Sequence, residues 1–165
     1  MRTLCLLCLA SCGIADFDID QPVMEQRITG SPLPGPLAAL FPLPLNVDLS
    51  AKIKAMDSGP IDSVSLKSLE LTITATAQPM GDWSFVDSVD VFVSSSKQGS
   101  TLPKVKLAHV MSPGKVTVMT FVPEPGVNLK PYIDEGSVVE GTSTGRAPNN
   151  DVTYDGDSTF TVHPL

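Results

Sequence analysis

An alternation of apolar and polar residues constrains this chain more than any other feature. In the run LELTITAT, residues 69–76, the odd positions are apolar and the even positions are polar. Successive side chains of a β-strand point to opposite faces, so the pattern predicts a strand with one buried face. The run VDVFV, residues 89–93, largely repeats it, and no segment after residue 12 keeps a 3.6-residue period over three turns. The chain is therefore expected to be all-β.

Turn-forming residues separate short strand candidates along the chain. SGP at 58–60, KQG at 97–99 and SPG at 112–114 each predict a turn, because glycine and proline favour turn geometries that strands do not use. About eight short strands separated in this way predict a two-sheet antiparallel sandwich, immunoglobulin-like or related. The candidate strands are residues 16–20, 47–54, 69–76, 89–93, 104–109, 116–122, 137–144 and 158–163.

The first twelve residues, MRTLCLLCLASC, have the layout of a secretory signal. Arg2 supplies a positive charge, and the seven residues 4–10 form an apolar run. A membrane span needs about 20 apolar residues, so this run is too short to be one. All three cysteines, Cys5, Cys8 and Cys12, lie here. A chain without further cysteines avoids wrong disulfides in an oxidising compartment, which favours an exported protein.

The apolar run ends in Leu9-Ala10-Ser11-Cys12, which resembles the lipobox of bacterial lipoproteins. The resemblance implies that a signal peptide, residues 1–11, is removed. It also implies that Cys12 carries a diacylglycerol on its thiol and an acyl chain such as palmitate on its new amino group. These chains would anchor the protein, since each buried CH₂ contributes about 0.8 kcal/mol. In such lipoproteins an aspartate after the cysteine often signals inner-membrane retention, so Gly13 implies the outer membrane.

Charge and length describe one acidic domain. Loss of Arg2 with the signal peptide leaves 10 basic residues against 18 acidic ones, a formal net charge of −8. An acidic surface repels phosphate backbones, so no nucleic-acid partner is expected. Repulsion from anionic headgroups also means that the acyl chains, rather than charge, hold the membrane. The expected organisation is a lipidated N-terminus and short tether over residues 12–15, followed by a single β-sandwich domain over residues 16–165.

The segment SPLPGPLAALFPLPL, residues 31–45, is an apolar exception. It carries five of the 15 prolines, and no charge occurs from residue 28 to residue 47. Prolines at this density deny a helix most of its hydrogen bonds, so a membrane helix is not expected. The interpretation that we favour is a proline-rich capping loop that closes one end of the sandwich, and the alternative is an exposed lip that binds lipid, a hydrophobic ligand or a partner. Both interpretations depend on Leu33, Leu37, Leu40 and Phe41.

Sequence motifs for catalysis are missing. The two histidines are His109 and His163, and a hydrolase would need one of them in a cleft beside a serine and an aspartate. The sequence has no Gly-x-Ser-x-Gly elbow, no phosphate loop and no dinucleotide fingerprint. We therefore expect a protein that is not an enzyme and that needs no cofactor besides its covalent lipid.

The run NNDVTYDGD, residues 149–157, is the best candidate for metal binding. Asp151, Asp155 and Asp157 supply closely spaced carboxylate oxygens, which Ca²⁺ prefers, although the spacing lacks the Asp-x-Asp-x-Asp-Gly pattern of calcium loops. Asp155-Gly156, between the β-forming runs VTY and STF, is also typical of a tight hairpin turn. The hairpin is the interpretation that we favour.

The end of the chain adds a second resemblance. LKPYIDEGS at 129–137, GRAP at 145–148 and the expected Asp155-Gly156 hairpin are similar to poorly characterised β-sandwich lipoproteins of Gram-negative envelopes. That resemblance implies no activity. The sequence thus predicts an outer-membrane lipoprotein that serves as a binding or structural module, with the membrane and an envelope protein as partners. The alternative is a carrier or sensor of a hydrophobic ligand or lipid that uses residues 31–45.

Overall fold

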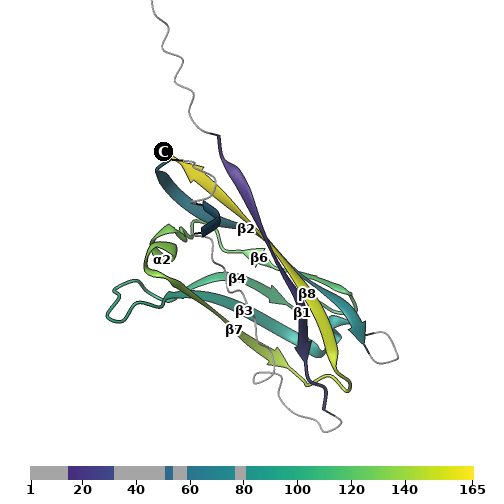
Figure 1. Cartoon of the computed structure of the whole chain (residues 1–165). Coiled ribbons are helices and arrows are strands. Elements are labelled where there is room, and N and C mark those ends of the chain that lie inside the picture. Colours follow the sequence, from purple (N-terminus) through teal and green to yellow (C-terminus); the bar gives the residue numbers. More distant parts are fainter. Residues whose placement is uncertain (1–14, 32–50, 54–58, 77–80) are drawn as a thin grey trace, which may run out of the picture.

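The computed structural model describes residues 15–31, 51–53, 59–76 and 81–165. Among these residues are eight strands, which form two antiparallel sheets of four strands each (Figure 1). This arrangement confirms the predicted all-β, two-sheet antiparallel sandwich. The strands are β1 (Phe17–Ile28), β2 (Ile61–Thr76), β3 (Val86–Ser95), β4 (Val105–Met111), β5 (Val118–Thr120), β6 (Val122–Pro123), β7 (Ser137–Gly145) and β8 (Val152–Pro164).

The order of the strands places segments that are distant in the chain side by side. One sheet has the order β1-β8-β2-β5, and the other has the order β6-β4-β3-β7. β8 therefore lies inside the first sheet and pairs along its length with both β1 and β2. The short helical elements η2 (Trp83–Phe85) and α2 (Lys130–Glu135) lie outside the sheets. In the described ranges, no helix is long and apolar enough to cross a membrane.

Alternating side chains of the two sheets meet in a hydrophobic core around Trp83. The indole ring is fully buried, and its centroid lies 5.7 Å from those of Phe85 and Tyr154. Its Nε1 donates to the carbonyl oxygens of Leu71, at 3.2 Å, and Thr117, at 3.1 Å. A buried indole N–H needs such acceptors, so these bonds fix the ring in place. Other buried members of the core include Ile19, Ile28, Val64, Leu69, Val91, Leu107, Phe121, Phe160 and Val162.

The prediction of a hairpin turn at Asp155-Gly156 is wrong. The dipeptide lies in the middle of β8, where Gly156 pairs with Val23 of β1 and with Leu71 of β2. A Cβ on Gly156 would lie 3.0 Å from Leu71 Cδ2, so the glycine makes room for that side chain. The glycine therefore marks a close approach inside the sheet, which sequence alone does not distinguish from a turn.

Two predicted strands also differ from the structure. Residues 51–53 are helical, although the pattern predicts a strand over residues 47–54. Alanine and lysine are good helix formers, and the Nζ of Lys52 donates to the carbonyl of Asp20 at 2.6 Å. The run 116–122, predicted as one strand, divides into β5 and β6, which belong to different sheets.

The outer edge of the first sheet has irregularities that protect it from pairing with other chains. β1 is an edge strand, and its pairing with β8 shifts register between Val23 and Gln26. Glu25, in this bulge, has a φ of 56°, and its N–H donates to Asp155 Oδ1 at 2.7 Å. Pro22 lacks an N–H altogether. Bulges and prolines prevent an edge strand from pairing with other chains, so this edge is a poor surface for strand addition.

The short helix α2 holds the loop between β3 and β4 through Glu135. The carboxylate accepts hydrogen bonds from Ser100 Oγ at 2.6 Å and from Ser95 Oγ at 2.7 Å, and Lys97 Nζ lies 3.5 Å away. The Ser100 hydroxyl, followed by Ser95 and the charge of Lys97, holds the pKa of Glu135 below its usual value. Ionised Glu135 therefore stabilises this end of the sandwich.

Replacing Glu135 with glutamine should reduce the acid sensitivity of the fold. Because the folded-state pKa is lowered, the carboxylate stabilises the fold above about pH 4.3, and this stabilisation is lost as pH falls through the folded pKa. Urea unfolding from neutral pH down to about pH 3 should show the two free energies of unfolding converging in acid. Asp134→Asn, which removes a helix-surface pair with Lys130, is the matched control. A wild-type-to-variant difference that stays constant across pH would contradict this expectation.

Candidate functional site

The segment 116–123 crosses from one sheet to the other. Its first half, β5, pairs with β2, whereas its second half, β6, pairs with β4. Phe121 lies at the crossing, is 2% exposed and donates its N–H to the carbonyl of Leu69 at 2.9 Å. Burial of this ring fixes the point where the chain changes sheets. Because only β6 pairs with β4, the residues of β4 beyond His109 are not paired with this segment.

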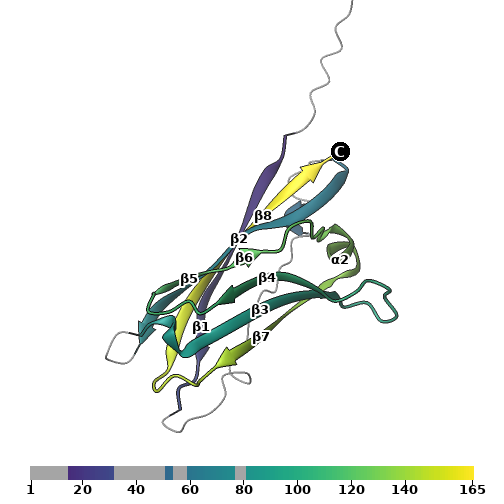
Figure 2. The same cartoon turned by 180° about the vertical axis from the view of Figure 1, so that it is seen from behind.

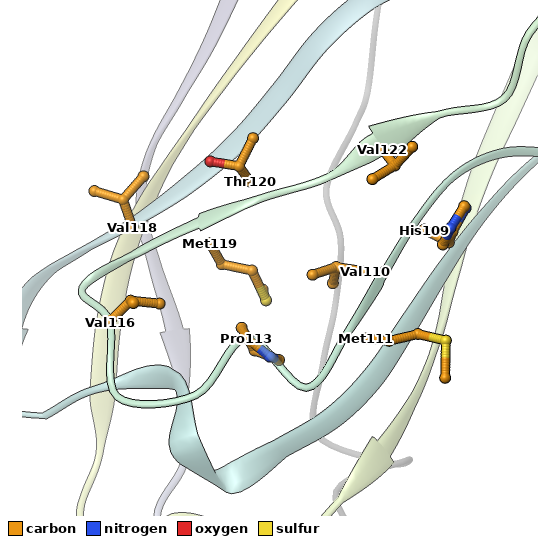
Figure 3. A pocket seen from close by; sticks show the side chains of 9 residues that line it. All are labelled: His109, Val110, Met111, Pro113, Val116, Val118, Met119, Thr120 and Val122. Atoms are coloured by element: carbon orange, nitrogen blue, oxygen red, sulfur yellow. The ribbon is translucent and has the colours of Figure 1, made fainter.

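An open cleft with a volume of about 470 Å³ lies between this segment and the end of β4. Met119 of β5 and Val110 of β4 point toward each other across it, and Pro113 and Val116 lie in the turn that joins the two sides (Figure 3). Met119 and Val110 are buried, so the floor of the cleft is apolar. The cleft is lined by His109, Val110, Met111, Pro113, Val116, Val118, Met119, Thr120 and Val122.

The lip of the cleft exposes large apolar side chains to solvent. Met111 is 75% exposed and Val122 is 57% exposed, while Val116 and Val118 are each about 40% exposed. Of the seven exposed large hydrophobic residues in the described ranges, these four line the same cleft. Single exposed apolar residues are ordinary, but several around one concave site mark a binding surface.

On each side of the cleft, a residue of the lining is bonded to a carboxylate. On the β4 side, His109 Nδ1 lies 2.9 Å from Glu124 Oε1, so the two side chains are hydrogen-bonded. On the β5 side, Thr120 Oγ1 donates to Glu70 Oε1 at 3.1 Å. The site therefore combines an apolar floor with two acidic margins, which suits a ligand that is apolar at its centre and basic at its ends.

The predicted lipidation site and the apolar residues of the predicted capping loop, or lip, lie outside the described residues. The first is Cys12, and the second comprises Leu33, Leu37, Leu40 and Phe41. Both stay predictions. The first strand of the sandwich begins at Phe17, five residues after Cys12.

The three predicted metal ligands, Asp151, Asp155 and Asp157, lie on or beside β8. Asp151 accepts the N–H of Gly30 at 2.8 Å and pairs with Arg27, and these two contacts, in that order, lower its pKa. Asp155 accepts a backbone N–H at the bulge in β1, whereas Asp157 is exposed. Within the part of the chain that the structure describes, no group of three or more His, Cys, Asp or Glu side chains could hold a metal ion. The metal hypothesis therefore finds no support there.

The two histidines lie in different places. His109 is at the cleft, whereas His163, near the end of β8, has its Nδ1 2.9 Å from Asp16 Oδ2. Among the described residues, neither imidazole is hydrogen-bonded to a serine or threonine hydroxyl. Each forms an imidazole–carboxylate pair without a nucleophile, so the geometry gives the hydrolase alternative no support.

Sequence reasoning missed the cleft, although the sequence carries a signal for it. In the run VTVMTFV, residues 116–122, apolar residues occupy both parities: Val116 and Val118 on one, Met119 and Phe121 on the other. A strand with two apolar faces is usually buried on both. Here the run lies at a sheet edge, so only Met119 and Phe121 are buried and the valines stay exposed.

Comparison with known proteins does not place the chain in a family. No family model matches it, and no curated protein matches it significantly. Among solved structures, a chain of turnip yellow mosaic virus matches 99% of this chain and 89% of its own length. The two are 12% identical, and the TM-score of 0.26 is too low to support any conclusion.

Proposed function

We propose that this protein is a lipid-anchored, non-enzymatic binding module of the outer membrane, held by Cys12 and binding its partner in the cleft beside β5. The observation that carries this proposal is the open apolar cleft, whose lip includes the exposed side chains of Met111 and Val122. Soluble domains seldom expose such a patch unless it binds something. The lipobox resemblance supports the anchor, and Gly13 supports the outer membrane.

The position of the cleft suits a partner other than the anchoring membrane. β1 begins at Phe17, which pairs with Val162 near the C-terminal end of β8. Val118, which lines the cleft, pairs with Thr72 of β2, and Thr72 pairs in turn with Asp155 of β8. The cleft therefore lies about seven residues along β8 from Val162. At about 3.3 Å per residue this separation is roughly 20 Å, and β5 lies toward the end of the sheet away from the C-terminus (Figure 2). A lipid on Cys12 would leave the cleft accessible.

Replacing Cys12 with alanine should abolish membrane association. Without the thiol neither lipid transfer nor cleavage at the lipobox can occur, and the acidic domain has no charge attraction to compensate. Metabolic labelling with a clickable fatty acid should disappear, and the protein should move from the membrane fraction to a soluble or precursor form. Ser11→Ala, which keeps a small residue before the cysteine, is the control. Persistent fatty-acid labelling of Cys12→Ala would rule out the lipobox interpretation.

A photo-crosslinking amino acid at position 111 should give adducts in intact cells. The matched control is position 138 on β7, at the opposite edge of the second sheet, where Val138 is also an exposed hydrophobic residue at 39%. A partner that occupies the cleft should be captured from position 111 and not from position 138. Equal capture from both positions, or none from either, would contradict a binding role for the cleft.

A further inference from the structure

The backbone beside the cleft carries unused strand-pairing groups. On either side of β5, Phe121 N–H donates to Leu69 O, and Thr117 O accepts the N–H of Ile73, each at 2.9 Å. In an antiparallel strand, alternate residues direct their N–H and C=O groups to opposite sides. Residues 117 and 121 thus bond to β2, and the amide groups of Val118 and Thr120 face away from β2. Because β5 is the last strand of its sheet in the described part of the chain, those groups form a free edge there.

The opposite wall of the cleft is also a strand edge. Glu124 N–H donates to Leu107 O at 2.9 Å, so Leu107 and, by alternation, Met111 direct their amide groups toward the β6 side of β4. The β4–β6 pairing comprises Ala108 and His109 and no residue further along β4. Met111 lies beyond it, beside the cleft. Unlike β1, which has a bulge and Pro22, β5 has no proline and no register shift in its described pairing, whereas the β4 side has a register shift at Leu107 and is followed by Pro113. The edge of β5 is therefore the one that is open to an added strand.

We propose that the cleft binds an extended, basic peptide segment, which adds as a strand to the free edge of β5. This inference rests on the proposed binding function and names its partner. Backbone groups of Val118 and Thr120 would pair with the peptide, and alternate apolar side chains of the peptide would enter the cleft above Met119 and Val110. An added strand would use both the free edge of β5 and the apolar cleft beside it. A compact apolar ligand would leave the edge amides without partners.

The charges at the cleft select a basic partner. Glu124 and Glu70 bond to His109 and Thr120, which line the two sides of the cleft, so lysine or arginine at both ends of the peptide would meet opposite charges next to the lining. Lys115, in the adjoining turn, lies near Asp82 and contributes, after hydrogen bonds from Ser84, to the lowered pKa of that carboxyl. A second copy of this chain is the wrong partner, because its own formal net charge is −7 and like charges repel.

The test uses the purified full chain and a fluorescein-labelled peptide of alternating valine and threonine with two lysines at each end. Fluorescence anisotropy should show saturable binding. N-methylation of the peptide amides that face β5 should weaken binding by at least about tenfold, because it removes the pairing donors. Val118→Pro should weaken binding to a similar degree, because it removes a backbone N–H of the protein that faces the peptide and not β2. Val118→Ala keeps that N–H and should retain most of the affinity.

Charge variants complete the test. The double variant Glu70→Gln and Glu124→Gln should weaken binding and reduce its salt dependence, whereas Glu140→Gln on β7 should change neither. If Val118→Pro does not fold, the N-methylated peptide still tests whether the peptide pairs with the backbone of β5. Absence of peptide binding at about millimolar concentration, or binding that N-methylation leaves unchanged, would overturn the inference. So would self-association of the chain that Val118→Pro abolishes. Crosslinks from position 111 without peptide binding would reject the peptide while leaving the cleft a binding site.

Discussion

Replacing Trp83 with alanine should lower the free energy of unfolding by about 3–5 kcal/mol, the range for a buried tryptophan or phenylalanine. Trp83 is fully buried and packs against Phe85 and Tyr154. The change would leave a cavity between the two sheets and remove the donor to the carbonyls of Leu71 and Thr117. Equilibrium urea unfolding, followed by circular dichroism, measures the loss.

Trp83→Phe separates the two contributions. Phenylalanine refills much of the cavity but leaves both carbonyls without the indole donor, so the expected loss is about 1–3 kcal/mol. Thr117, which contributes one of these carbonyls, immediately precedes β5, so the indole also ties the crossing segment to the core. A loss below about 1 kcal/mol for Trp83→Ala would show that the ring is not an essential part of this core.

The alternation in the sequence was sufficient to predict the fold class. Leu69 and Leu71, which the pattern places on the buried face, are 0% and 2% exposed. The same alternation predicts which residues of β3 face the core, and Val89, Val91 and Val93 are buried there. Period-2 patterning carries this information because each strand has one face in the core and one face toward solvent.

Strand ends and sheet membership could not be predicted in the same way. Gly156 is typical of a turn, but its missing Cβ accommodates Leu71, which is distant in the sequence. The run 116–122 reads as one strand, yet Phe121 divides it between two sheets. Both errors arise because the deciding contacts are tertiary, and local propensity contains no information on them.

The candidate cleft, too, depends on tertiary contacts that the sequence does not show. Its residues come from the end of β4, the following turn and β5, and each stretch looks like an ordinary half-buried strand or turn. What makes the site is the change of sheet at Phe121: the residues before it pair with β2 and the residues after it pair with β4, which leaves a cleft between β5 and the end of β4. A sequence pattern can indicate surplus apolar residues in such a run, but only the strand order shows that they line a cleft at the edge of a sheet.

Replacing Gly145 with alanine should cost about 3 kcal/mol or more, because strain and overlap add. Gly145, at the end of β7, has a φ of 138°, which side chains rarely allow. An added Cβ would overlap the carbonyl oxygen of Phe85 and lie 3.0 Å from the N of Asp87. That carbonyl already accepts the N–H of Arg146 at 3.0 Å, so it cannot move without losing a hydrogen bond.

The matched control for Gly145→Ala is Gly126→Ala, which isolates the conformational part of the cost. Gly126 also has a positive φ, 76°, but nothing lies within 4 Å of its added Cβ. Its substitution should therefore cost only about 1 kcal/mol, the left-handed backbone penalty alone. Urea unfolding of both variants gives the comparison. The overlap in Gly145→Ala is with the backbone of Phe85, at the end of η2, and of the first residues of β3, and backbone cannot rotate away as a side chain can. The difference between the two losses therefore measures how rigidly the end of β7 is held against this backbone. Equal losses would mean that this end of the second sheet relaxes freely and that the close approach at Phe85 does not constrain the fold.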